Sequence, residues 1–139
     1  MSLWVLDTDH LSFFQQNHPI VKQRVNALNS EEVAITIITV EEQLYGRLNR
    51  IRRAKSADEL VTAYARMCDL LEDIKNINIL DFDQEAYNCY TELVRQKVRI
   101  GTQDLRIAAC VISRSGVLVT RNRRDFERVP ALRFEDWTI

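Results

Sequence analysis

Four short, largely apolar segments recur along the chain, and sequence typical of helices separates each from the next. They cover residues 3–6, 33–38, 77–80 and 117–120. Strands that are apolar on both faces are typical of parallel sheets, because helices cover both faces of such a sheet. A further segment at residues 132–134 indicates an edge strand. The alternation therefore predicts an α/β fold with a parallel four- to five-stranded sheet and helices on both faces.

Capping residues and helical spacing predict where the first connecting helices begin. Residues 11–14 indicate a short helix with Asp9 as its cap, and Pro19 opens a second helix. Capping boxes at residues 39–42 and 56–59 predict the starts of two longer helices. These helices fill the connections between the first three strands.

The second half of the chain contains a helix that is apolar on almost all sides. Asp83 caps the helix before it, and residues 101–104 open the apolar helix itself. Its segment 105–112 has hardly any polar face, which is typical of a central helix covered on most sides. Residues 121–128 indicate a charged turn and a short helix after the fourth strand.

Length and composition set limits on the partners of the chain. We expect residues 1–139 to form a single domain, because no repeat or linker interrupts them. Only three glycines and two prolines are present, which excludes a collagen-like or disordered chain. Nineteen Lys and Arg oppose 20 Asp and Glu, giving a net charge of −1. Binding to nucleic acid must therefore rest on local basic patches rather than on overall charge.

Cysteine usage and the N-terminal residues predict a cytoplasmic location. Cys68, Cys89 and Cys110 are far apart and lack the spacing of a zinc site. The simplest interpretation is a reducing compartment. The first residues lack the features of a signal peptide, and the apolar runs are far shorter than a membrane span. No membrane partner is expected.

Acidic residues follow the predicted strands at the edge where open parallel sheets bind their ligands. Asp7 follows the first strand, Glu42 the second and Asp125 the fourth. Asp104 opens the apolar helix that leads into the fourth strand, so it belongs to the same edge. We therefore expect four carboxylates to converge.

Carboxylates held close together repel one another, and a bound divalent cation removes that conflict. Mg²⁺ or Mn²⁺ prefers oxygen ligands and keeps several water molecules. Such an ion makes water a better nucleophile and stabilises negative charge on a phosphate. The convergence predicts a site that hydrolyses phosphodiesters.

Each acid also has a purely structural interpretation. Glu42 completes a capping box, and Asp125 stands in the same relation to Asn122. Asp104 lies in a helical first turn, where the helix dipole favours an acid, and Asp7 would close a turn. The expected meeting of all four at one edge favours the site.

The histidines, the cysteine of the apolar helix and the nearby serines give weaker evidence for a catalytic or metal site. His10 and His18 are too few and too near the N-terminus for a zinc or acid–base centre, so both are interpreted as surface or loop residues. Cys110 is interpreted as a core residue. Ser113 and Ser115 have no histidine nearby in the sequence and no nucleophile-elbow glycines, which argues against a serine hydrolase.

Two stretches of the chain are rich in basic residues. Residues 47–55 hold four arginines and one lysine, which we interpret as a solvated helix face. Residues 121–128 hold four arginines directly beside the acidic edge. Arginine forks match phosphate geometry, so Arg121 and Arg124 are candidates for binding a polyanionic substrate.

Four motifs resemble those of the PIN-domain family, in the order expected for that family. Residues 6–9, Leu-Asp-Thr-Asp, resemble its opening motif, and residues 42–46, Glu-Gln-Leu-Tyr-Gly, resemble its second acidic motif. Residues 100–109 and 118–126 resemble the third and fourth motifs, which are the most specific. The resemblance covers nearly the whole chain and points to the VapC-type toxin ribonucleases of bacterial toxin–antitoxin pairs.

The resemblance implies a PIN-like fold and a Mg²⁺- or Mn²⁺-dependent endoribonuclease that cleaves RNA. It also implies a homodimer and a small VapB-like antitoxin that blocks the site. Carried over by residue, Asp7 and Asp104 are the principal metal ligands, Glu42 and Asp125 complete the acidic cluster, and Thr120 and Asn122 shape the floor of the pocket. Asp9 departs from the asparagine usual at its position and adds one negative charge.

Two other functions are compatible with parts of the pattern. A haloacid-dehalogenase-type phosphatase also begins with a strand followed by Asp-x-Asp, with Asp7 as nucleophile and Asp9 as acid–base. That family usually has Thr or Val two residues after the second aspartate, where this chain has Leu11. It also has a lysine before a late acidic pair, where this chain has arginines. A non-catalytic module that binds RNA or a protein is the other alternative, and the four filled acidic positions argue against it.

Overall fold

Five short strands form one fully parallel sheet in the order β3-β2-β1-β4-β5. The computed structural model describes residues 2–139. The strands are β1 (Trp4–Leu6), β2 (Val33–Thr36), β3 (Asn78–Leu80), β4 (Val117–Val119) and β5 (Arg133–Glu135). The predicted α/β fold is confirmed, and the weak segment near the end of the chain is indeed an edge strand, paired with β4.

Helices make the connections between the strands. They are α1 (Thr8–Gln15), α2 (Pro19–Asn26), α3 (Ile37–Arg53), α4 (Ala57–Ile74), α5 (Gln84–Arg95), α6 (Thr102–Ser113) and α7 (Arg123–Phe126), with a 3₁₀ turn at Ser30–Glu32. Parallel strands need such crossovers, because the chain must return to the start of the sheet after each strand. As predicted, Ser56 caps α4 and Asp83 caps α5 through side-chain oxygens.

Two helices begin earlier than predicted, and both differences bear on the site. The cap of α1 is Asp7 rather than Asp9, because Oδ1 of Asp7 accepts the backbone N–H of His10 at 3.0 Å. The predicted capping box at residues 39–42 is wrong, because Thr36 caps α3 and its Oγ1 accepts the backbone N–H of Thr39 at 3.1 Å. Glu42 therefore lies beyond the first turn of α3 and is free of a capping role.

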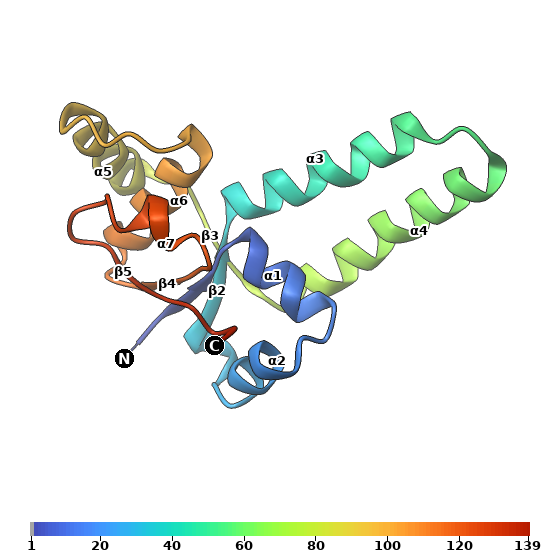
Figure 1. Ribbon diagram of the computed structural model, residues 1–139, viewed down its shortest axis with the longest axis horizontal. Coiled ribbons are helices and arrows are strands. Elements are labelled where there is room, and N and C mark those ends of the chain that lie inside the picture. The colour runs from blue at the N-terminus through green and yellow to red at the C-terminus, as the bar shows by residue number, and fades with distance from the viewer. Residues whose placement is uncertain (1) are drawn as a thin grey trace.

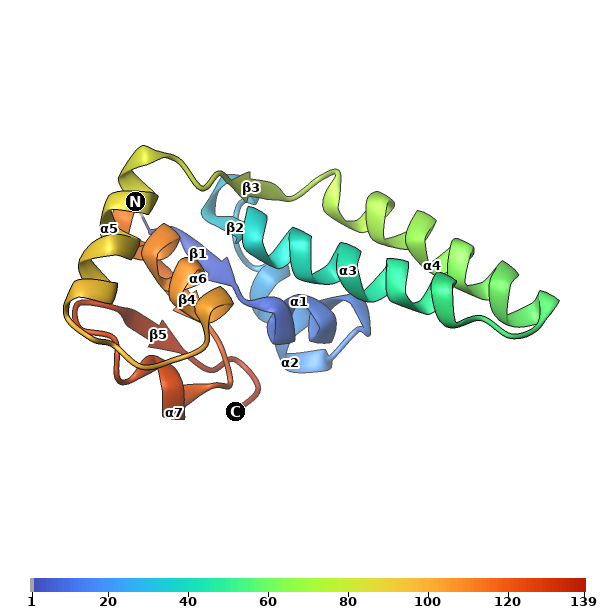
Figure 2. The same ribbon diagram turned by 90° about the horizontal axis from the view of Figure 1, so that it is seen from above.

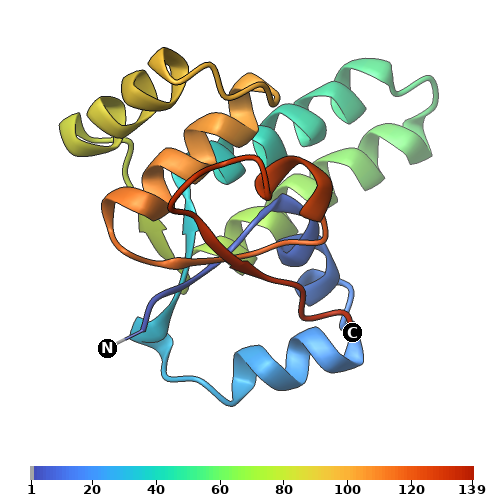
Figure 3. The same ribbon diagram turned by 60° about the vertical axis from the view of Figure 1, so that its left-hand side comes forward.

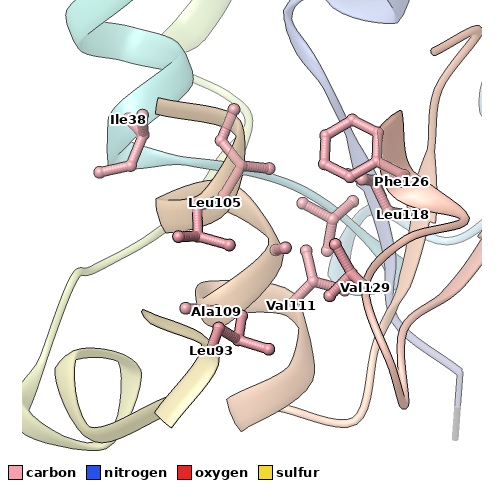
Figure 4. Close-up of a cluster of buried hydrophobic side chains, with 11 residues drawn as sticks. Ile38, Leu93, Leu105, Ala109, Val111, Leu118, Phe126 and Val129 are labelled. Atoms are coloured by element: carbon pink, nitrogen blue, oxygen red, sulfur yellow. The ribbon is translucent and has the colours of Figure 1, made fainter. Parts of the chain in front are cut away.

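The sheet separates two apolar cores. On one face, β1 and β4 contribute Val5 and Leu118, which pack against α6 and the end of α5 (Figure 4). On the other face, the neighbouring strand residues Leu6 and Val119 pack against α1, α2 and α4. Adjacent residues of a strand point to opposite faces, so short strands without polar positions serve both cores. Figure 3 shows α5 and α6 on one side of the sheet and α1 and α2 on the other.

Helices α3 and α4 form an antiparallel hairpin that extends well away from the sheet (Figures 1 and 2). Helix α1 lies beside the base of this hairpin. Within residues 2–139, no helix combines the length and apolar character required to cross a membrane.

Candidate active site

The four predicted acids lie at the carboxyl edge of the three central strands. Asp7 directly follows β1, Glu42 lies in the helix after β2, and Asp125 lies in α7 after β4. Asp104 is in the first turn of α6. Burial, together with the negative charges of Glu42, Asp7, Asp125 and Asp9 in that order of effect, raises the pKa of Asp104 to about 6. The carboxylates are therefore close enough to repel one another, as the sequence predicted.

Asp7 is held rigidly at the centre of this edge. Its backbone N–H donates to the carbonyl of Val119 at 3.0 Å, which extends the pairing of β1 with β4. Its Oδ1 accepts the N–H of His10, and only 6% of the residue is exposed. Among the described residues its Oδ2 has no hydrogen-bond donor, so one carboxylate oxygen is available to a ligand.

Glu42 is held by a threonine from α1. The Oγ1 of Thr8 donates to Oε1 of Glu42 at 2.6 Å and lies 3.3 Å from Oγ1 of Thr39. This contact joins the first turn of α1 to α3 and fixes the orientation of the Glu42 carboxylate. Sequence reasoning did not find the role of Thr8, because the contact spans 34 positions in the chain.

Asn122 bridges the remaining two acids. Its Nδ2 lies 3.0 Å from Oδ2 of Asp125 and 3.4 Å from Oδ2 of Asp104. The Asn122 side chain also caps α7, and its backbone N–H donates to Oγ1 of Thr120 at 2.9 Å. Thr120 is buried directly after β4 and supports Asn122 from below. The structure thus brings the predicted floor residues into the acidic cluster.

The two predicted substrate-binding arginines differ in their surroundings. The guanidinium of Arg121 lies 5.6 Å from the centre of the Phe13 ring. Arg124 is exposed and, in residues 2–139, makes no hydrogen bond or ion pair. Asp9 is exposed as a residue, yet partial burial of its carboxyl group and the charge of Asp7 raise its pKa overall.

His10 is the residue that the sequence interpretation misplaced. It is fully buried, and its Nε2 accepts the backbone N–H of Trp137 at 3.1 Å. A neutral imidazole that accepts at Nε2 carries its proton on Nδ1. That Nδ1 is buried, lies 3.5 Å from Oδ1 of Asp7 and has no hydrogen-bond partner. His10 therefore packs next to the Asp7 carboxylate without a hydrogen bond to it. His18, in contrast, is partly exposed and caps α2, which agrees with a loop position.

The donor set fits a hard divalent cation. Among residues 2–139, no three carboxylate, imidazole or thiol groups form a preassembled metal cluster. Mg²⁺ is usually held by one or two carboxylates and completes its coordination with water, so it does not require such a cluster. The oxygens at this edge belong to carboxylates, an amide and a hydroxyl, which are ligands that Mg²⁺ and Mn²⁺ accept.

Comparison with known proteins agrees with this geometry. The sequence model of the PIN domain matches residues 4–132. The chain is 32% identical to the tRNA(fMet)-specific endonuclease VapC of Salmonella typhimurium, with 99% of both chains covered. It is also 32% identical to ribonuclease VapC2 of Haemophilus influenzae, again with 99% of both covered.

Solved structures give the same result. The DNA-bound VapBC structure from Salmonella typhimurium has a TM-score of 0.79 at 32% identity and covers 99% of both chains. VapBC2 from Rickettsia felis, bound to a promoter DNA fragment, has a TM-score of 0.76 at 26% identity and covers 97% of this chain and 98% of that one. These matches give no support to the phosphatase alternative. The chain belongs to the PIN-domain family and, within it, to the VapC proteins.

Proposed function

We propose that this protein is a metal-dependent endoribonuclease that acts as the toxin of a toxin–antitoxin pair. The single observation that carries the proposal is the convergence of Asp7, Glu42, Asp104 and Asp125 at one edge of the sheet, where burial and the neighbouring acids raise the pKa of Asp104. The similarity to VapC ribonucleases supports RNA as the substrate class. Because the Salmonella relative is a tRNA(fMet)-specific endonuclease, a tRNA is the first substrate to test.

Asp7 and Asp104 would hold the metal ion, Mg²⁺ or Mn²⁺. When bound, the ion supplies positive charge that activates water and stabilises the charge that develops on the phosphate. Thr8 holds Glu42 in one orientation, and Asn122 holds Asp104 and Asp125 side by side.

The arginines next to the site supply the substrate contacts. Arg121 is fixed against Phe13 beside the acidic edge, so its guanidinium can meet a neighbouring phosphate without much loss of side-chain freedom. Arg124 is exposed on α7 and is free to do the same. Thr120 supports Asn122 and so keeps the floor of the pocket in place.

The partners follow from the family and from the surface. The solved relatives are VapBC complexes, so a VapB-like antitoxin is the proposed protein partner. An antitoxin arginine placed against the acidic cluster would block metal and RNA together, because a guanidinium bonds carboxylates with two parallel donors. Tyr45 and Tyr64 are 70% and 55% exposed on the α3–α4 hairpin, and such apolar surface favours a homodimer. We also propose that residues 1–139 act as one domain in the cytoplasm, where RNA is available.

The test is a cleavage assay with three substrates. Purified protein is incubated with tRNA, with single-stranded DNA and with a phosphomonoester, each with Mn²⁺ or with EDTA. We expect Mn²⁺-dependent cleavage of tRNA only, and loss of cleavage in Asp104→Asn. The matched control is Glu31→Gln, an exposed acid just before β2 at the opposite edge of the sheet. Turnover of the phosphomonoester, or RNA binding without cleavage, would contradict the proposal.

A further inference from the structure

The α3–α4 hairpin and α1 enclose a second, arginine-rich pocket beyond the acidic cluster. Its volume is about 760 Å³. Arg47, Arg50 and Arg53 line it from α3, Arg66 lines it from α4, and Ser12 belongs to its α1 wall. The three arginines of α3 follow one another at intervals of three residues. Arg50 and Arg53 are exposed, as expected for a solvated helix face, and the pocket shows that this face is also concave.

The pocket offers hydrogen-bond donors that the protein itself does not use. Nε of Arg47 and Nε2 of Gln15 are both buried and have no hydrogen-bond partner. In the described part of the chain, none of the four arginines forms an ion pair. Two acids, Asp58 and Glu59, also line the pocket, and Glu59 accepts the backbone N–H of Lys55. Four positive charges thus face two negative ones, which leaves a positive excess.

The pocket continues the surface on which the acidic cluster lies. The contact between Thr8 and Glu42 joins α1 to α3 at the cluster. One helical turn further along α1, Oγ of Ser12 accepts from Nε2 of the next α3 residue, Gln43, at 3.2 Å. Ser12 of this second contact also lines the pocket. At about 1.5 Å per residue, the arginines from 47 to 53 lie roughly 8 to 17 Å beyond Glu42 along the axis of α3. Figures 1 and 2 show α1 beside the base of the hairpin.

We infer that this arginine pocket binds the phosphate backbone of the substrate RNA on one side of the cleaved bond, an inference that rests on the proposed ribonuclease function. A nucleic-acid strand carries one negative charge per nucleotide, so a strand whose phosphate lies at the acidic cluster presents further phosphates to the arginines. The row of guanidiniums at regular helical spacing suits such repeated charge, and arginine forks bind phosphate with two parallel donors. An RNA strand that passes over the acidic cluster also explains why the pocket lies next to that cluster on the same side of α1 and α3.

The test measures RNA binding in EDTA, so that no cleavage is required. The probe is a fluorescein-labelled single-stranded RNA of about twelve nucleotides, followed by anisotropy at salt concentrations between about 50 and 200 mM. The variants are Arg50→Gln, Arg53→Gln and Arg66→Gln, which are exposed enough to leave the fold intact. The control is Arg52→Gln, an exposed arginine of the same helix that does not line the pocket. Thermal unfolding of every variant accompanies the binding curves.

We expect each pocket variant to bind the RNA about fivefold more weakly and to lower the slope of log affinity against log salt by about 0.7. Arg52→Gln keeps the wild-type affinity and slope. In a cleavage assay with Mn²⁺ the pocket variants raise KM and leave kcat unchanged, because the lost contacts are equally strong in the ground state and the transition state.

Two results would overturn the inference. One is wild-type RNA affinity and salt slope in all three pocket variants. The other is unchanged RNA binding together with loss of binding to a glutamate-rich peptide, which would make the pocket a docking site for an acidic protein segment. A wild-type protein that binds RNA through the pocket but cleaves none would instead refute the proposed function, so the two failures are distinguishable.

Discussion

Replacing Asp104 with asparagine should stabilise the metal-free protein. Burial and the neighbouring acids raise the pKa of Asp104 from 3.8 to about 6 in the folded state. The folded protein therefore binds this proton more tightly than the unfolded chain does. The sign follows from linkage: at a pH above the folded pKa the ionised carboxylate destabilises the fold, and this penalty disappears as the pH falls towards the unfolded pKa.

The size of the effect follows from the shift. Each pKa unit corresponds to about 1.4 kcal/mol, so a shift of roughly two units sets a ceiling of about 3 kcal/mol. Asp104 is only half-buried, and solvent screening reduces that ceiling. We expect Asp104→Asn to raise the free energy of unfolding by about 1 to 2 kcal/mol at pH about 7.5, and by much less at pH about 4.5.

Urea denaturation in EDTA at these two pH values measures the difference. Glu31→Gln serves as the control and should change the free energy of unfolding by less than about 0.5 kcal/mol at either pH. Equal or lower stability of Asp104→Asn at the higher pH would refute the claim that the acids repel one another. Addition of Mn²⁺ should reverse the order, because only the wild-type protein gains the free energy of metal binding.

Three further predictions follow from the same contacts. The affinity for Mn²⁺, measured by calorimetry, should fall as the pH drops below about 6, because Asp104 must lose its proton to bind the ion. Thr8→Val should lower kcat about tenfold while Thr8→Ser keeps it, because only a hydroxyl can hold Glu42; equal rates in the two variants would contradict this role. Asp7→Asn should abolish Mn²⁺ binding and RNA cleavage yet keep the helical circular dichroism, because asparagine caps α1 as well as aspartate does.

Local pattern was sufficient to predict the sheet and the position of the acids, because short apolar strands and the residues just after them are adjacent in sequence. Prediction from local pattern failed where a capping residue sets the boundary between a strand and a helix. The β-branched residues 35–38 look like one strand, but the Thr36 hydroxyl ends it and starts a helix. It also failed for contacts between distant segments. The burial of His10 depends on Trp137, and the arginine pocket depends on two other helices facing Arg47 and its neighbours.

The contact of His10 with Trp137 makes the surroundings of Asp7 depend on a segment far away in the sequence. Trp137 donates its backbone N–H to His10 and its ring centre lies 5.6 Å from that of Trp4. The packing behind the Asp7 carboxylate is therefore complete only when the segment after β5 has docked against α1 and β1. Local opening of that segment would expose His10 while the sheet and the α3–α4 hairpin stay folded, so the acidic edge can loosen without global unfolding.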